Sequence, residues 1–230
     1  MSLDVYDHEG FRVASELYRR AAGQQQVLRD TTWLGLRALQ LPEDLVAMQE
    51  LVWALAPDVI IETGVAYGGS VIFYASLLEL LGRGRVVGID VRFRRGVRKR
   101  IATHPLGHRV SLIEASSTDG QVIDDLREAI EPDERVLVVL DADHSYDHVS
   151  QELELYSELV TPGSYLVATD GVMEVLSDAP AGQVAWATDN PARAARDFLA
   201  RHPEFSADPH YERFGPTFFP GGYLRRSDGS

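Results

Sequence analysis

The order of apolar and polar positions changes repeatedly between a strand-like pattern and a helix-like pattern. Short runs of β-branched and aliphatic residues are typical of buried parallel strands, and they occur at 59–62, 85–90, 109–114, 135–140 and 164–169. Apolar residues at helical spacing predict helices at 8–23, 42–56, 68–81, 119–130, 145–160 and 190–201. The alternation predicts an α/β protein, with an open and mostly parallel sheet joined by right-handed crossovers.

The two ends of the chain depart from this alternation. Residues 172–188 lack periodicity and predict a long loop of the kind that often forms a lid over a site. Segments 204–208 and 218–225 predict two last strands that pair antiparallel. We expect residues 1–42 to form an N-terminal helical extension or cap, and residues 43–230 to form one cofactor-binding domain.

The N-terminal region offers one helix and one aromatic residue in a loop. The helix at 8–23 has an apolar face made of Phe11, Val13, Ala14, Leu17 and Tyr18. Residues 24–42 are predicted to be irregular and contain Trp33 next to Gly35. Trp33 either covers a ligand or closes the edge of the core, and the sequence favours neither alternative.

Acidic residues stand at or next to the ends of all five predicted parallel strands. They are Glu62, Asp90, Glu114, Asp141 and Asp170. The carboxyl ends of parallel strands meet at one edge of the sheet, where ligands of open α/β sheets bind. Carboxylates gathered there repel one another, so we expect cations among them.

The loop after the first strand predicts a cofactor site. Its glycines, Gly64, Gly68 and Gly69, allow close backbone approach, but their spacing differs from the Gly-x-Gly-x-x-Gly of dinucleotide sites. Glu62 suits a positively charged group, and Asp90 suits ribose hydroxyls. S-Adenosylmethionine combines both features, whereas glycines serving loop geometry alone would need no ligand. The candidate cofactor-binding residues are Glu62, Thr63, Gly64, Tyr67, Gly68, Ser70, Asp90, Ser116 and Asp141.

Asp141 and Asp170 predict a second, metal-binding site. Two carboxylates at the ends of neighbouring strands can hold Mg²⁺, which lowers the pKa of a hydroxyl. Asp143 is a third candidate ligand, or it orients the nearby imidazole of His144. His144, with an ordinary pKa of about 6.5, suits a base that collects the hydroxyl proton. The candidate catalytic residues are therefore His144 and Asp141; helix capping is the alternative for the two strand-end acids.

Composition limits the partners. The 230 residues carry a net charge of −13, which disfavours nucleic acids and anionic membranes. There is no cysteine, and the N-terminus lacks the pattern of a signal peptide, so we expect a cytoplasmic protein. The basic segment 92–100 predicts a solvated helix face or a local anion site.

Three stretches resemble the cephalosporin hydroxylase-like family, which includes rhamnosyl O-methyltransferases. They are VIIETG at 59–64 with GGS at 68–70, VLDADHS at 139–145, and LVTPGSYLV at 159–167. The resemblance runs from about Trp33 to Leu224. It implies the Rossmann-like, seven-stranded class I methyltransferase fold, S-adenosylmethionine and often Mg²⁺. The family often has Glu-Asp-Gly where this chain has Thr169-Asp170-Gly171, which removes one possible metal ligand.

The leading hypothesis is a Mg²⁺-assisted, S-adenosylmethionine-dependent O-methyltransferase. Its partner would be a small natural product with a hydroxyl group, and the resemblance implies a sugar hydroxyl. One alternative is a non-catalytic or partner-dependent subunit of a tailoring system. Another is a nicotinamide-dependent oxidoreductase, which the glycine spacing disfavours. We also expect a homo-oligomer.

Overall fold

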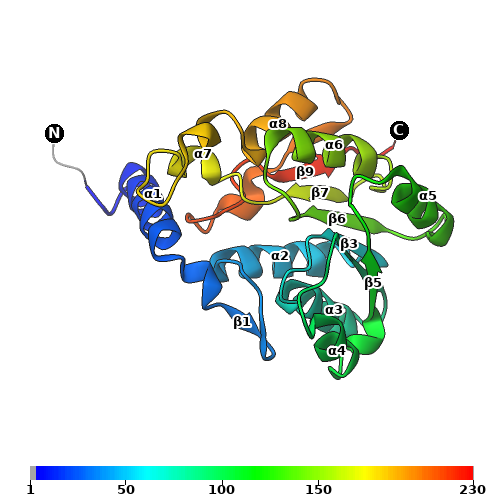
Figure 1. Cartoon of the computed structure of the whole chain (residues 1–230). Coiled ribbons are helices and arrows are strands. Elements are labelled where there is room, and N and C mark those ends of the chain that lie inside the picture. Colours follow the sequence, from blue (N-terminus) through cyan, green and yellow to red (C-terminus); the bar gives the residue numbers. More distant parts are fainter. Residues whose placement is uncertain (1–3, 230) are drawn as a thin grey trace.

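A computed structural model describes residues 4–229, which are built around a seven-stranded sheet (Figure 1). Five strands pair in parallel: β3 (Val59–Thr63), β4 (Arg85–Asp90), β5 (Val110–Glu114), β6 (Val136–Leu140) and β7 (Tyr165–Ala168). Two strands at one edge run antiparallel: β8 (Phe205–Ala207) and β9 (Tyr223–Arg226). The sheet order is β5-β4-β3-β6-β7-β9-β8. The predicted α/β fold, with its antiparallel terminal pair, is confirmed.

Helices cover both faces of this sheet because its central strands are apolar on both sides. Along β3, Ile60 packs into one core, whereas Val59 and Ile61 pack into the other, as the alternation of strand side chains requires. The first core includes α2 (Pro42–Leu55), α3 (Gly69–Leu81) and α4 (Val97–Ala102). The second core includes α5 (Gly120–Ala129), α6 (Tyr146–Ser157) and α8 (Pro191–Leu199).

The order in which the chain adds strands to the sheet reverses between β3 and β6. From β3 the chain adds β4 and then β5 on one side, whereas β6 and β7 follow on the other side. Such a switch point leaves a crevice beyond the carboxyl ends of the strands, where open α/β sheets bind ligands. The glycine loop after β3 and the Asp141 segment after β6 therefore lie next to each other.

The N-terminal region forms the predicted helix, but the expected apolar face is not its buried side. The helix α1 (His8–Gln25) buries Gly10, Ser15 and Ala22, whereas Phe11 and Leu17 stay exposed. The prediction for that face is wrong because α1 packs through its small residues, with Gly23 next to Leu176. A 3₁₀ turn η1 (Val27–Arg29) and a hairpin of β1 (Thr32–Trp33) and β2 (Leu36–Arg37) follow.

Trp33 closes the edge of the core. Its ring packs edge-on against Phe73 with a centroid distance of 4.9 Å, and its indole N–H donates to the Ser76 hydroxyl at 3.0 Å. Both ends of the side chain are therefore satisfied by the protein. Of the two alternatives left by the sequence, the structure favours the core residue over the ligand cover.

Two segments near the C-terminus differ from expectation. Residues 172–188 contain a short helix α7 (Met173–Leu176) and a 3₁₀ turn η3 (Val184–Ala187), separated by irregular chain. The strand predicted from 218 begins only at Tyr223, because a turn around Gly221 interrupts the extended backbone. The remaining 3₁₀ turns are η2 (Gly107–Arg109) and η4 (Pro209–Glu212). In the described part of the chain, every helix is too short or too polar to cross a lipid bilayer.

Candidate active site

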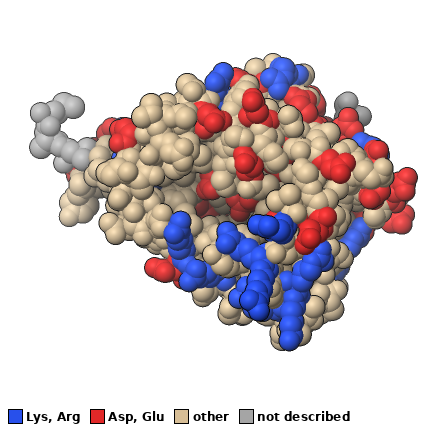
Figure 2. All heavy atoms as spheres, in the orientation of Figure 1, with Lys and Arg blue, Asp and Glu red and all other residues tan. Residues whose placement is uncertain are grey.

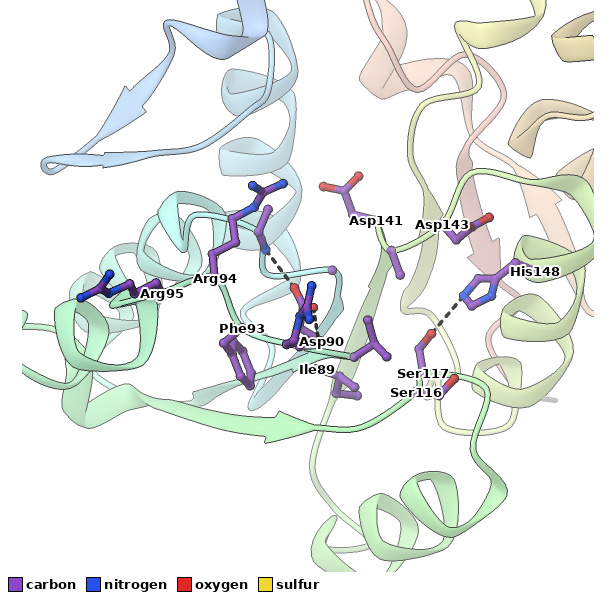
Figure 3. Close-up of a pocket in the computed structure, with 15 residues that line it drawn as sticks. Ile89, Asp90, Phe93, Arg94, Arg95, Ser116, Ser117, Asp141, Asp143 and His148 are labelled. Carbon is purple, nitrogen blue, oxygen red and sulfur yellow. Dashed lines mark hydrogen bonds between the residues drawn. The ribbon is translucent and has the colours of Figure 1, made fainter. Parts of the chain in front are cut away.

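A cavity of about 830 Å³ opens at the carboxyl ends of β3, β4, β5 and β6 (Figure 3). Its lining includes the predicted residues Gly64, Asp90, Ser116, Asp141 and Asp143. They come from four successive loops, and the parallel sheet brings these loops to one edge. In the space-filling view a hollow with acidic side chains lies at the centre of this face, and a row of basic side chains follows one of its borders (Figure 2).

The glycine loop needs its glycines for two physical reasons. Gly64 has a φ of +83°, and a Cβ there would lie 1.9 Å from the carbonyl oxygen of Asp141. Gly68 has a φ of +85° and caps the start of α3. The loop thus passes directly against the end of β6, and Tyr67 lies between the two glycines.

Asp90 supports the glycine loop as well as facing the cavity. One carboxylate oxygen accepts hydrogen bonds from the backbone N–H groups of Val65 and Ala66, both at 3.1 Å. The other oxygen accepts from the N–H of Arg92 at 3.0 Å. An ionised carboxylate has about four acceptor positions, so Asp90 retains capacity for a ligand hydroxyl.

Glu62, Thr63 and Ser70 are buried and do not line the large cavity, although Ser70 lines the smaller cavity that adjoins it. Glu62 is fully buried and accepts a hydrogen bond from the Ser70 hydroxyl at 3.0 Å. Burial, together with the charge of Asp141, raises the pKa of Glu62 well above its usual range. The Thr63 hydroxyl accepts from the backbone N–H of Asp141 at 3.2 Å. Glu62 therefore lies in the core, although its position at a strand end had suggested contact with a charged ligand.

Asp141, His144 and Asp170 lie together at the ends of β6 and β7. One potential ligand atom from each side chain lies within 4.8 Å of the others. The Nε2 atom of His144 is 3.1 Å from a carboxylate oxygen of Asp170. Asp170 has a φ of +55°, which costs a non-glycine residue about 1–3 kcal/mol and is common at functional sites.

The electrostatics of this group fit a bound cation. Burial and the neighbouring Asp170 raise the pKa of Asp141 to about 7. Burial by itself lowers the pKa of His144, but the carboxylates of Asp170, Asp141 and Asp143 outweigh it and raise that pKa. A divalent ion with a preference for oxygen ligands would relieve the repulsion between the two carboxylates. The donor set of these residues therefore fits Mg²⁺.

The third predicted metal ligand, Asp143, lies outside this group, and Thr169 stands beside the group where a possible ligand is missing. Asp143 is exposed and accepts hydrogen bonds from the backbone N–H and hydroxyl of Ser145, the first at 2.8 Å. Thr169 is buried, and its hydroxyl is within hydrogen-bond distance of both Leu140 and the Asp141 carboxylate. Thr169 can therefore orient Asp141 through its hydroxyl.

Two smaller cavities adjoin the same group. One of about 170 Å³ is lined by Arg37, Tyr67, Asp141, His144 and Asp170, among others, and it continues the large cavity past the glycine loop. The other, of about 270 Å³, has His144 and Asp170 in its wall. The rest of that wall is mainly apolar and comes from the end of α1, from η1, from residues 172–186 and from Phe218; its large apolar side chains are Leu28, Met173, Leu176, Trp186 and Phe218. Asp141, His144 and Asp170 thus lie between the large cavity with its 170 Å³ continuation and the mainly apolar pocket.

Three cavity residues escaped prediction from the sequence. Ser117 and His148 line the large cavity, and their side chains are 3.1 Å apart (Figure 3). His148 lies in the first turn of α6, four residues after His144, and its closeness to a candidate base is the signal that could have found it. Arg37 lies in a two-residue strand, where no sequence pattern indicates the side on which its side chain lies.

Comparison with known proteins places this geometry in a family. Residues 25–227 match the rhamnosyl O-methyltransferase/CmcI family. The chain belongs to this family. It is thereby an S-adenosylmethionine-dependent O-methyltransferase, and the resemblance seen in the sequence is confirmed. A rhamnosyl O-methyltransferase of Mycobacterium tuberculosis strain H37Rv is 29% identical over 225 residues, which cover 94% of this chain and 85% of the relative.

Solved structures support the fold of this family member. An apo structure of CmcI has a TM-score of 0.61 and 20% identity, covering 87% of this chain and 78% of that one. A CmcI structure described as Mg-SAM has a TM-score of 0.58 and 18% identity, covering 86% and 77%. The class I methyltransferase fold implied by the sequence is confirmed.

Proposed function

We propose that this O-methyltransferase uses Mg²⁺ and methylates a hydroxyl group, preferably of a sugar, on a small natural product. The observation that carries the proposal is the group of Asp141, His144 and Asp170, located between the large cavity and a mainly apolar pocket. Two similar proteins support the proposal: the relative from Mycobacterium tuberculosis is a rhamnosyl O-methyltransferase, and one CmcI structure is described as Mg-SAM.

The large cavity would hold the adenosine part of the cofactor. Asp90 can accept from the ribose hydroxyls, and Ser116 and Ser117 line the same space further along the strand ends. Because Gly64 has no side chain, the backbone of this loop can approach the cofactor closely. The reactive methyl group would then point toward Asp141, through the smaller cavity that adjoins the large one.

Asp141 and Asp170 would hold Mg²⁺, with Thr169 orienting Asp141 by its hydroxyl. When bound, the ion supplies positive charge that favours ionisation of the acceptor hydroxyl. Asp170 would keep the imidazole in position through Nε2, which is 3.1 Å from its carboxylate, and the other ring nitrogen of His144 would take the hydroxyl proton. Much of the rate gain would come from holding the reacting groups in line.

The acceptor would bind in the pocket beside His144 and Asp170. Its wall of leucine, methionine, tryptophan and phenylalanine side chains suits the apolar face of a sugar ring or of an attached aglycone. Residues 172–188 contribute much of this wall, which supports the expectation that they act as a lid. Oligomerisation and a cytoplasmic location stay predictions.

The test is methyl transfer to a panel of rhamnosides and other hydroxylated natural products, detected by mass spectrometry. We expect a mass increase of one methyl group that requires S-adenosylmethionine. EDTA should abolish turnover and added Mg²⁺ should restore it. Full turnover in EDTA would contradict the proposed requirement for Mg²⁺. Methylation of simple phenols in preference to glycosides would contradict the proposed preference for a sugar hydroxyl.

A further inference from the structure

Among residues 4–229, most arginines lie within 4.0 Å of a carboxylate, and more than half of the exceptions lie at or near one cavity edge. Arg92, Arg94 and Arg95 line the large cavity and Arg37 lines the smaller one, and none of the four has a carboxylate partner. Lys99 and Arg100 on α4 also lack one, as do Arg29, Arg135 and Arg226 elsewhere in the described part of the chain. A row of basic side chains follows one border of the acidic hollow (Figure 2), and Arg92, Arg94 and Arg95 line the cavity at this edge. Although the chain has a net charge of −13, Arg98 is the one basic side chain of segment 92–100 that pairs with a carboxylate, that of Glu114.

Two of these arginines are held against the same aromatic ring. The guanidinium carbon of Arg94 is 4.6 Å from the ring centroid of Tyr67, and that of Arg37 is 5.4 Å from it. The ring attracts each cation, but the two like charges repel each other. An anion bound next to Tyr67 would satisfy both guanidinium groups, which form bidentate hydrogen bonds with carboxylates.

The Tyr67 ring lies where two cavities meet. Arg94 lines the large cavity, Arg37 and Tyr67 line the smaller one, and both cavities share Gly64 and Asp141. In Figure 3 the side chain of Arg94 extends toward the side of the cavity that faces Asp141, whereas Arg95 points away. A cofactor with its ribose at Asp90 and its methyl group near Asp141 has its sulfur between these points, and its amino-acid portion branches from that sulfur. The cavity that contains Tyr67 and Arg37 also borders Gly64 and Asp141, so it can take this branch.

We infer that Arg37 and Arg94, brought together by Tyr67, bind the α-carboxylate of the cofactor's amino-acid portion. The inference rests on the cofactor placement in the proposed function. It assigns the basic segment after β4 a local anion site and gives the two arginines a positioning role. By fixing the carboxylate, they would fix the sulfonium and its methyl group relative to His144.

The experiment compares two nucleosides that differ at the carboxylate. S-Adenosylhomocysteine carries the amino-acid portion, whereas methylthioadenosine retains the adenosine and the sulfur but lacks it. In calorimetry, Arg94→Ala and Arg37→Ala should each raise the Kd of S-adenosylhomocysteine about tenfold or more, the usual loss for charged hydrogen bonds. The Kd of methylthioadenosine should stay within about twofold, which also verifies that each variant is folded.

Arg100→Ala is the matched control, because Arg100 is an exposed cation of the same segment that contacts neither Tyr67 nor the cavity. It should leave both Kd values near those of the wild type. Equal weakening of both nucleosides by Arg94→Ala and Arg37→Ala would overturn the inference. So would unchanged nucleoside binding combined with a raised acceptor KM, which would assign the arginines to an acidic acceptor. Failure of the wild type to bind either nucleoside would instead contradict the proposed cofactor placement.

Discussion

Strand-end carboxylates of this protein have different environments, although they follow the same sequence pattern. Glu62 is enclosed in the core, Asp90 holds the backbone of the glycine loop, and Asp141 and Asp170 lie close together beside an imidazole. The difference arises because neighbouring residues of a strand point to opposite sides, whereas residues just beyond the strand follow the loop. Of these four acids, Asp141 and Asp170 are the two whose carboxylates lie close enough to share a metal ion.

His144 could serve as a base or as a metal ligand, and substitution separates the two roles. We expect His144→Ala to lower turnover by about 10²–10⁴-fold, the range for a lost general base. Mg²⁺ affinity, measured by calorimetry, should change little because Asp141 and Asp170 remain. His108→Ala, at an exposed histidine, is the control. A parallel loss of Mg²⁺ binding and turnover would show that His144 is a ligand.

Thr169 stands where the family pattern implied by the sequence resemblance has an acid. Glu at this position would place a second carboxylate beside that of Asp141, in a site that is almost fully buried. We expect Thr169→Glu to lower the Tm without Mg²⁺ because of the buried like charges. Mg²⁺ should then raise the Tm more than in the wild type, since an added carboxylate tightens binding. An unchanged response to Mg²⁺ in thermal melting would exclude Thr169 from the metal environment.

At the scale of elements, the glycine loop is fitted against the end of β6. Gly64 has no space for a side chain because the Asp141 backbone is in contact with it, and Asp90 fixes the following two N–H groups. The loop therefore couples three strand ends and sets the width of the cofactor cavity. This coupling can be tested with a pair of matched glycines.

Gly64→Ala combines backbone strain with a steric clash, whereas Gly82→Ala provides strain alone. Both glycines have a positive φ, but a Cβ at Gly82 would have no atom within 4 Å. We expect both variants to lose about 1–2 kcal/mol of unfolding free energy from the strain. Only Gly64→Ala should also weaken S-adenosylhomocysteine binding, by about tenfold or more, because the loop must shift. Equal binding by both variants in calorimetry would show that the loop does not shape the site.

At the scale of the whole molecule, a buried acid joins the N-terminal half to the C-terminal segment. Asp44 on α2 accepts hydrogen bonds from the Thr217 hydroxyl and from the Phe218 N–H, the latter at 3.0 Å. Burial raises the pKa of Asp44 to about 7, although these hydrogen bonds oppose the shift. The native state therefore retains a proton that the unfolded chain releases above pH ~4.

This raised pKa predicts the sign of a pH dependence. The stabilising contribution of protonated Asp44 is complete below pH ~4 and is lost as the pH rises through about 7. Urea unfolding should give a lower unfolding free energy at pH ~8 than at pH ~5.5, and Asp44→Asn should reduce this difference by about 2 kcal/mol. Asp133→Asn, at an exposed acid, should leave it unchanged. An undiminished difference in Asp44→Asn would contradict the assignment to this residue.

The sequence by itself determined the fold class, the strand order along the chain and the acids at the strand ends, because periodicity and glycine spacing are local properties. It also predicted that Asp141, His144 and Asp170 lie together, because the carboxyl ends of parallel strands meet at one edge of the sheet. Tertiary structure alone decided that Glu62 lies in the core, that Asp143 lies outside the carboxylate group, and that α1 exposes its apolar face. These outcomes depend on which neighbours a side chain meets across the sheet, and residues distant in sequence supply those neighbours. The same reason brought Arg37 and Arg94 to one tyrosine ring.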